Sequence, residues 1–404
     1  MRNRNLLYFS GFFGNFFFER GIWILYLTSM NYSLFLVGIL QSVLNLAMFL
    51  AEVPSGVISD RIGRKKSLLL GHFMVIVYLV MFLSFHNFIA LFIAHIIYGI
   101  GLTFISGTDH AFLFDSLKEQ GKEKWYGKSI GNYNGLVILG LAIAMGIGGY
   151  LQEISWSYVF IAGIVTQLIA MAVITQLTEI KFENSEHETQ TVGDILKEVK
   201  DFFRLNKAFK YLVLSLSVFF AITSVFYMYG QDLLSQEGLS VRNISIIFAG
   251  LSILQALCSI FSSKPAEKFT PRRVLLLTFC IIGAAYLFIP SGSLYVTIAA
   301  FVVINALYDV IEPVSSQVVN NEIPSRTRAT LLSIISLMTS LFMFIAFPFI
   351  GFLTDYFDSA LLLTAIGVLS ILLSLFMMLS FYKLKASVAI QNKVELNQND
   401  KGMM

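Results

Sequence analysis

Six ionisable residues stand inside long apolar runs of the chain, and their types are suited to chemistry. An ionisable side chain is costly in hydrocarbon, so residues of this kind are functional candidates by default. A carboxyl or imidazole group there can carry a proton, and a guanidinium can hold an anion. The six residues are Glu19, Arg20, His95, Asp109, Asp309 and Glu312.

Two of these carboxylates are close in sequence. Asp309 and Glu312 are three positions apart, which places them on one face of a helix, and Pro313 follows directly. Two carboxylates in a low dielectric should ionise at different pH values, one of them near neutrality, as a proton-coupling site requires. A structural pair is the alternative. Asn305 and Tyr308 lie one turn earlier and, with Gln255, are candidates to contact a bound solute.

Other ionisable candidates within the predicted spans could have a structural role instead of a functional one. Glu19 and Arg20 fall about 14 residues into the first apolar run, roughly 21 Å along a helix and beyond the bilayer midplane. Neighbours on a helix point about 100° apart, so each should find a partner on another helix or bind cargo. The alternative for this pair is a structural ion pair with other helices. His95, in mid-span, is either a protonatable relay or a buried, hydrogen-bonded histidine.

The composition decides the class of protein that carries these residues. The 404 residues are 56% hydrophobic and 13% charged, with a net charge of +3. Because soluble domains average about 25% charged residues, this is an integral membrane protein. The first apolar run is long enough to span, so we expect no cleavable signal peptide. Cys258 and Cys280 both lie in apolar runs, which argues against a disulfide framework or a metal site.

The apolar runs predict an all-α membrane protein with 12 transmembrane helices in two groups of six. The bilayer requires roughly 20 apolar residues per helix. We expect a six-helix bundle over 1–177, a polar cytoplasmic linker over 178–210, a second bundle over 211–382 and a disordered tail over 383–404. The spans are 5–29, 34–58, 67–86, 88–115, 127–150, 154–177, 211–233, 243–263, 273–290, 293–320, 329–352 and 359–382.

The distribution of cations predicts the orientation in the membrane. With the N-terminus inside, 26 of the 28 Lys and Arg residues fall on the cytoplasmic side, and the exceptions are Arg20 and Arg242. The positive-inside rule therefore places both termini in the cytoplasm of a multi-pass protein of the cell membrane.

The two halves also resemble each other. The run from Asp60 to Lys66 and the run from Glu267 to Arg273 both begin with an acid and a base and end in a basic pair. A duplicated six-span unit is typical of transporters built from repeats, with a central cavity between the halves.

The loop after the second span carries the most specific motif. Gly56-x3-Asp60-Arg61-x-Gly63-Arg64-Lys65 resembles the loop signature of the major facilitator superfamily, and its place in a six-plus-six chain extends the resemblance to nearly all of the sequence. The fifth span resembles the glycine-rich antiporter motif of that family's drug-efflux branch, for which close helix packing is the alternative. Its glycines are Gly131, Gly140, Gly148 and Gly149.

The resemblance implies a gate at this loop. Asp60 would face the positive end of the eleventh span near Ala329, and Arg61 or Arg64 would pair with Asp115. We expect this lock to hold the outward-facing state. Glu52 leads into the motif as a gating or packing contact. The resemblance also implies that the fourth span lines the cavity, which would place Asp109 there.

These observations predict a monomeric secondary transporter that works by alternating access, with a small-molecule substrate and the lipid bilayer as its partners. The expected activity is proton-coupled efflux of hydrophobic or cationic compounds; the alternatives are a proton-coupled symporter for a small polar solute and a non-transporting receptor or scaffold. Gly121 to Ser129 has one residue too many for a phosphate-binding loop, so we expect no ATP or other cofactor, and the proton gradient as energy source. We expect no nucleic acid partner and no enzymatic activity.

Overall fold

A computed structural model describes residues 2–179, 204, 206–262, 269–323 and 328–402, and every regular element in this part of the chain is helical. The first half holds α1 Arg2–Gly14, α2 Trp23–Ser29, α3 Leu34–Ile62, α4 Arg64–Ser84, α5 Phe88–Ile105, α6 Thr108–Lys118, the 3₁₀ turn η1 Glu123–Trp125, α7 Tyr126–Ile154 and α8 Trp156–Thr175. The second half holds α10 Lys207–Gln236, α11 Val241–Phe261, α13 Pro271–Tyr286, α14 Leu294–Glu322, α15 Arg328–Thr354 and α16 Ser359–Gly402.

Ten of the twelve predicted spans coincide with helical segments that are long and apolar enough to cross a membrane. The two others differ for separate reasons. The predicted span 5–29 is divided between α1 and α2, and the predicted span 273–290 is the 16-residue helix α13. The count of twelve spans in two repeats therefore stays a prediction.

The division of the first span corrects the helical geometry expected for Glu19 and Arg20. Both lie in the non-helical stretch 15–22 between α1 and α2, so the 100° relation between helical neighbours does not apply. Gly14 precedes this stretch and Gly21 lies near its end, and a Cβ at Gly14 would overlap the His72 ring. Hydropathy did not reveal this break, because Phe16, Phe17 and Phe18 keep the run apolar although Glu19 and Arg20 follow them.

The predicted fourth span is also divided. α5 ends at Ile105 and α6 begins at Thr108, and Gly107 between them has a φ of 80°. Glycine adopts this left-handed conformation at no steric cost. The turn changes the direction in which the first residues of α6 face.

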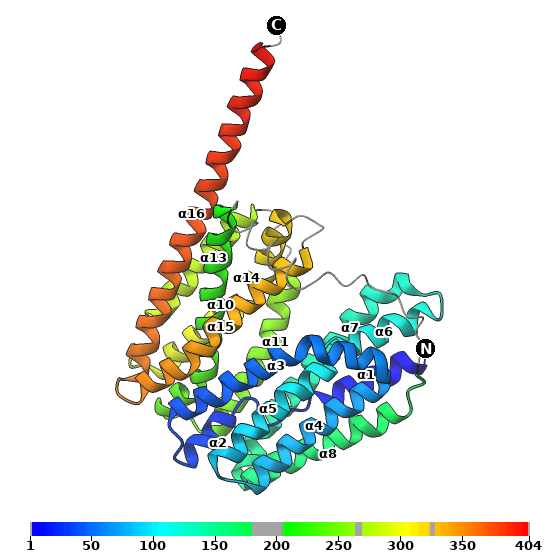
Figure 1. Cartoon of the computed structure of the whole chain (residues 1–404). Coiled ribbons are helices and arrows are strands. Elements are labelled where there is room, and N and C mark those ends of the chain that lie inside the picture. The colour runs from blue at the N-terminus through cyan, green and yellow to red at the C-terminus, as the bar shows by residue number, and fades with distance from the viewer. Residues whose placement is uncertain (1, 180–203, 205, 263–268, 324–327, 403–404) are drawn as a thin grey trace.

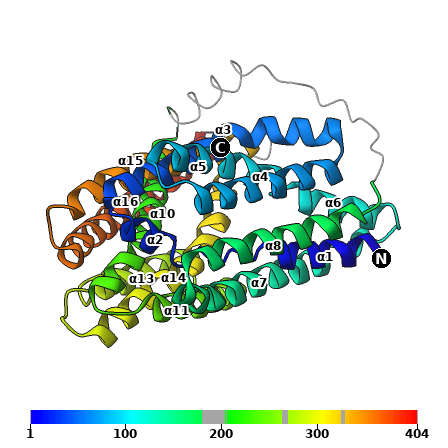
Figure 2. The same cartoon turned by 90° about the horizontal axis from the view of Figure 1, so that it is seen from below.

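The two groups of helices splay apart at one end and meet at the other (Figures 1 and 2). We call the end that carries Gly56–Lys66 the loop end and the opposite end the far end. Across the two halves, α3 packs on α15 and α7 packs on α11. Glycines permit this close approach. A Cβ at Gly38 would lie 2.5 Å from the Phe347 carbonyl oxygen, and a Cβ at Gly351 would overlap the Leu34 carbonyl oxygen.

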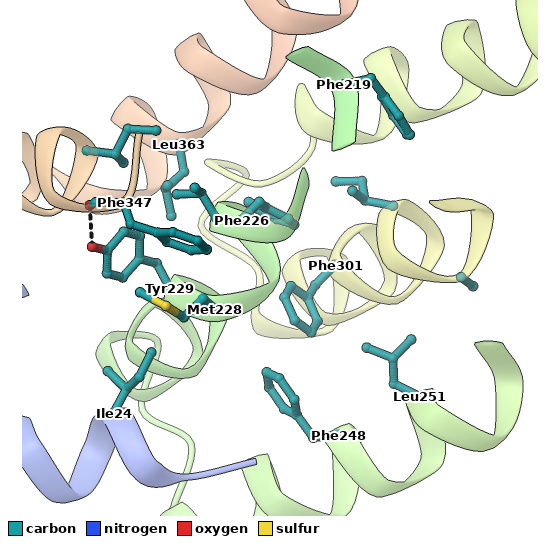
Figure 3. Packing of buried hydrophobic residues seen from close by; sticks show 14 of the residues in the cluster. Ile24, Phe219, Phe226, Met228, Tyr229, Phe248, Leu251, Phe301, Phe347 and Leu363 are labelled. Carbon is teal, nitrogen blue, oxygen red and sulfur yellow. Dashed lines mark hydrogen bonds between the residues drawn. The ribbon is translucent and has the colours of Figure 1, made fainter. Parts of the chain in front are cut away.

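Polar contacts reinforce the closed far end. The Tyr229 hydroxyl of α10 lies 2.6 Å from the Phe347 carbonyl oxygen, the bond drawn in Figure 3, and 3.1 Å from the Leu34 carbonyl oxygen of the other half. Arg242 of α11 forms an ion pair with Glu153 of α7 at 3.2 Å. Behind these contacts lies an aromatic core that includes Phe226, Phe248 and Phe301, also drawn in Figure 3.

The C-terminal segment differs from the expected disorder. α16 continues as a helix to Gly402 and extends away from the other helices (Figure 1). Between Lys383 and Asp400 the sequence contains neither proline nor glycine, so nothing in it interrupts the helix. Near its base, Lys385 contacts Glu322 of α14, and Arg272 lies over the Tyr382 ring.

Candidate functional site

A cavity of about 490 Å³ lies between the halves, and a second of about 630 Å³ leads from it toward the loop end. Asn45, Met48 and Met343 line both, so the two form one passage. The inner cavity is lined by Glu19, Arg20, Trp23, Gln41, Leu44, Asn45, Met48, Tyr78, His95, Tyr98, Leu102, Leu141, Thr223, Ser224, Tyr227, Met228, Gln231, Ser252, Gln255, Asn305, Tyr308, Met343 and Phe347. Because the far end is closed, the passage opens at the loop end.

The break in the first span brings Glu19 and Arg20 to this cavity. The Glu19 side chain is 3% exposed, and within the described part of the chain its Oε2 has no hydrogen-bond partner. Arg20 is exposed to the open volume of the cavity, which Tyr98 also lines. The site therefore places a buried carboxyl group with free bonding capacity next to a guanidinium.

Aromatic rings form the wall around this pair. Tyr78 and Tyr98 are stacked with centroids 4.2 Å apart, and Trp23 lies 5.5 Å from the His95 ring. His95 is 2% exposed, and its Nδ1 lies 2.9 Å from the Leu91 carbonyl oxygen, to which it donates in the tautomer that this distance implies. His95 thus has the contacts of a buried, hydrogen-bonded histidine, although its ring borders the cavity.

The second half contributes the amide and hydroxyl groups that the sequence singled out. Gln255, Asn305 and Tyr308 all line the cavity, and Gln255 Nε2 donates to the Asn305 carbonyl oxygen at 3.3 Å. Asp309 is half-buried and does not line either cavity. Glu312 is exposed and lies outside both cavities as well. The predicted solute contacts are therefore in the cavity wall, whereas the predicted carboxylate pair is not.

Asp109 does not face the cavity, contrary to the expectation for its span. It is 8% exposed, and its carboxylate accepts from the Tyr133 hydroxyl and from the His110 backbone N–H, both at 2.7 Å. The physical reason is its place in the turn that follows Gly107: Thr108 and Ala111 of this turn line the passage, whereas Asp109 points toward Tyr133 of α7. Asp109 is a bonded residue inside the first half.

At the loop end, the structure distinguishes between the two arginines of the motif. Arg64 NH1 lies 2.5 Å from Asp115 Oδ2, and the two side chains are 13% and 16% exposed. Arg61 is exposed. The predicted pair with Asp115 is thus made by Arg64, at the start of α4 and the end of α6.

Gly63 and Lys65 connect the motif to the end of α8. The Lys65 ammonium donates to the carbonyl oxygens of Thr175 at 2.5 Å and Leu177 at 2.9 Å, where a helix C-terminus favours a cation. In return, the Glu179 carboxylate accepts from the Lys65 backbone N–H. Gly63 has a φ of 94°, and a Cβ there would lie 2.9 Å from the Glu179 carboxyl group. The positive φ favours glycine at this motif position, whereas the exposed Glu179 side chain could move aside.

The remaining motif residues border the mouth of the passage. Glu52, Gly56 and Asp60 line it from α3, and Ser336 and Ser340 of α15 line it from the other half. The side chain of Ala329, near the expected partner of Asp60, lies outside the described residues. The contact between Asp60 and the eleventh span, and the lock it would form, stay predictions.

The glycines of α7 act as close packing positions. A Cβ at Gly148 would overlap the Phe18 carbonyl oxygen, and one at Gly140 would overlap that of Phe12. A Cβ at Gly149 would overlap the Cα of Arg242 in α11, whereas a Cβ at Gly131 would meet open space. The helix thus supports the first span at its break and joins the halves.

Sequence reasoning missed several cavity residues, among them Gln41, Asn45 and Gln231. Gln231 is 1% exposed and bonds the backbone of Arg20, within the break of the first span, and of Ile24, in the first turn of α2. Buried amides in apolar spans are a signal of the same kind as buried charges, because a polar group in hydrocarbon requires a partner.

Comparison with known proteins decides the family. The family model described as Major Facilitator Superfamily matches residues 6–240 and 211–399. The chain belongs to this superfamily. The protein is 26% identical over 324 residues to the uncharacterized MFS-type transporter YxaM of Bacillus subtilis strain 168. The match covers 78% of this chain and 79% of YxaM.

Two further similarities bear on fold and function. Quinolone resistance protein NorA of Staphylococcus aureus is 23% identical over 337 residues, with 82% of this chain and 84% of that one covered. The crystal structure of the nucleoside transporter NupG superposes with a TM-score of 0.74 at 16% identity, covering 95% of this chain and 98% of that one. The chain is thus a multi-pass membrane transporter of this superfamily and not an enzyme.

Proposed function

We propose that this transporter exports hydrophobic or cationic small molecules in exchange for protons, by alternating access between its halves. The observation that carries the proposal is Glu19, a buried carboxyl group in the cavity wall with an oxygen that has no partner. A carboxyl group in such a site is most stable when it holds either a proton or a cationic partner. Exchange of one for the other couples cargo to protons.

The other cavity side chains support the choice of cargo. Tyr78, Tyr98 and Trp23 present ring surface, and Met48, Met228 and Met343 present flexible thioethers that adapt to different shapes. The similarity to NorA, a protein named for quinolone resistance, agrees with export. The proton gradient is the energy source in this proposal, and no cofactor takes part.

A second candidate, proton-coupled uptake of a small polar solute, has its own supporting observation. Arg20 extends into the cavity, and Gln255 and Asn305 lie in the opposite wall. A guanidinium with facing amides suits a solute that carries an anionic group and hydroxyls. The similarity to NupG, a nucleoside transporter, supports the fold alone.

The side of the membrane on which the passage opens follows from the orientation that the cation distribution predicts. If both termini are cytoplasmic, the mouth at Glu52 and Asp60 opens into the cytoplasm. An exporter in this state is ready to take cargo from the cell.

Reconstitution into vesicles with an imposed pH gradient separates the candidates. Vesicles would be given either cationic dyes or a panel of sugars, nucleosides and amino acids, with protein-free vesicles as control. Export predicts that dye moves against the direction of proton flow. Movement of a polar solute with the protons would favour the second candidate. If a pH gradient of either sign moves no solute, proton coupling is wrong.

A further inference from the structure

One buried amide joins the second half to the break in the first span. Gln231 of α10 donates from Nε2 to the Arg20 carbonyl oxygen at 3.2 Å, and its Oε1 accepts from the Ile24 backbone N–H at 3.1 Å. The side chain is 1% exposed, so these bonds are shielded from water. Both polar ends of this amide are bonded to the backbone of the other half.

The two backbone groups are spaced as in a regular helix. Arg20 and Ile24 are four residues apart, and in an α-helix the N–H of the later residue would donate directly to the carbonyl of the earlier one. Here the Gln231 amide stands between them and replaces that single bond with two bonds of its own. Insertion of a side chain into the helical hydrogen-bond ladder is a recognised cause of sharp helix breaks.

We propose that Gln231 is a positioning residue that holds the first span open, so that Glu19 and Arg20 face the cavity only while α2 and α10 remain together. Separation of the halves at the far end would withdraw the amide from the break. The Ile24 N–H and the Arg20 carbonyl would then bond to each other and continue the helix through Arg20. The cavity groups would turn as the far end opens.

The surroundings of Gln231 fit a mechanical link of this kind. α2 is short, and it packs on α10 as well as on α3. Ile24 is fully buried, and Figure 3 shows it next to Met228 and Tyr229 of α10. The break therefore lies inside the contact between the halves, not at its edge. The link uses the alternating access of the proposed function but requires no particular cargo.

The test measures how far apart the halves are at the far end. His86→Cys and Ser291→Cys, both exposed positions at that end, carry spin labels in a Cys258→Ser, Cys280→Ser background of the full chain. Distances are measured in lipid nanodiscs at one pH without cargo. Gln231→Leu should raise the ratio of open to closed far ends about tenfold, the equivalent of roughly 1.4 kcal/mol, which is about one hydrogen bond net.

A control lies on the same helix. Gln236 is exposed and bonds the Asp232 carboxylate, so Gln236→Leu should leave the distance distribution unchanged. If Gln231→Leu gives the distribution of the unsubstituted protein, the proposed role is refuted.

A second variant covers the event that Gln231→Leu does not fold. Gln231→Asn keeps the amide but is one methylene shorter, so it cannot reach both Arg20 and Ile24. It should shift the distances in the same direction as leucine, and an unchanged distribution counts against the proposal. Because no gradient is applied, a shift without any vesicle transport would overturn the proposed function alone. Transport without a shift would overturn only the role of Gln231.

Discussion

Replacement of Gly38 by alanine should drive the transporter out of the arrangement described above. A Cβ at this position would lie 2.5 Å from the Phe347 carbonyl oxygen and 2.6 Å from the Tyr229 hydroxyl. Each distance is roughly 1 Å shorter than an ordinary contact, and the backbone carbonyl can retreat only if α15 moves away from α3. Overpacking of this kind costs about 1–3 kcal/mol, and that cost applies only while the far end is closed.

The expected effect is a shift of population rather than loss of the fold. A cost of about 2 kcal/mol corresponds to a roughly 30-fold change in the ratio of the two states. The spin-label pair at His86 and Ser291 measures this ratio directly. Gly250→Ala is a matched control because Gly250 also lies inside a helix, α11, has open space around it and lines neither cavity. Both substitutions gain the same helix propensity, about 1 kcal/mol.

A specific result would refute this reasoning. If Gly38→Ala and Gly250→Ala give the same distances, close packing of α3 on α15 does not set the equilibrium. A longer distance in Gly38→Ala alone supports the assignment of Gly38 to the far-end contact.

Three further predictions concern the first half. Asp109→Asn should leave the pH dependence of transport unchanged while lowering the melting temperature in detergent, because this carboxylate bonds inside the first half; a changed pH dependence would return it to the proton path. A double-mutant cycle of Arg64→Gln and Asp115→Asn should give a coupling energy of about 1–3 kcal/mol in detergent unfolding, and near-zero coupling would contradict the pair. Lys65→Met should lower the melting temperature by about 2 °C, since it leaves two carbonyls at the end of α8 unbonded, whereas the exposed Lys66→Met should not.

Much of the fold could be predicted because the bilayer imposes a simple rule. Apolar length alone located ten spans that coincide with helices. The same rule could not find the break at 15–22, because its phenylalanines are as apolar as a helix requires. What holds that break open is Gln231, about 210 positions away, and no local pattern contains it.

The candidate site was predicted in part, for similar reasons. Glu19, Arg20, Gln255, Asn305 and Tyr308 all line the cavity because polar groups in apolar spans must face a partner or an opening. Asp109 satisfied the same rule with a partner, Tyr133, instead of the opening. Sequence shows that such a residue needs a contact but not which of the two it has.

One contact of the loop motif was predicted at the level of individual residues. Arg64 was one of two expected partners of Asp115, and position decided between them, since Arg64 begins α4 while Arg61 stays exposed. The role of Lys65 at the end of α8 was not foreseen, because it depends on where the last turn of a helix more than a hundred residues later comes to lie.

The most direct test of the central claim is proton release on cargo binding by the purified protein. A dye or solute that moves in the vesicle assay would be added to the protein in weakly buffered detergent solution with a pH indicator, at a pH where the carboxyl group of Glu19 holds its proton. The account predicts proton release from the unsubstituted protein and none from Glu19→Gln. Equal release from both proteins would contradict it and would place the coupling proton on another residue.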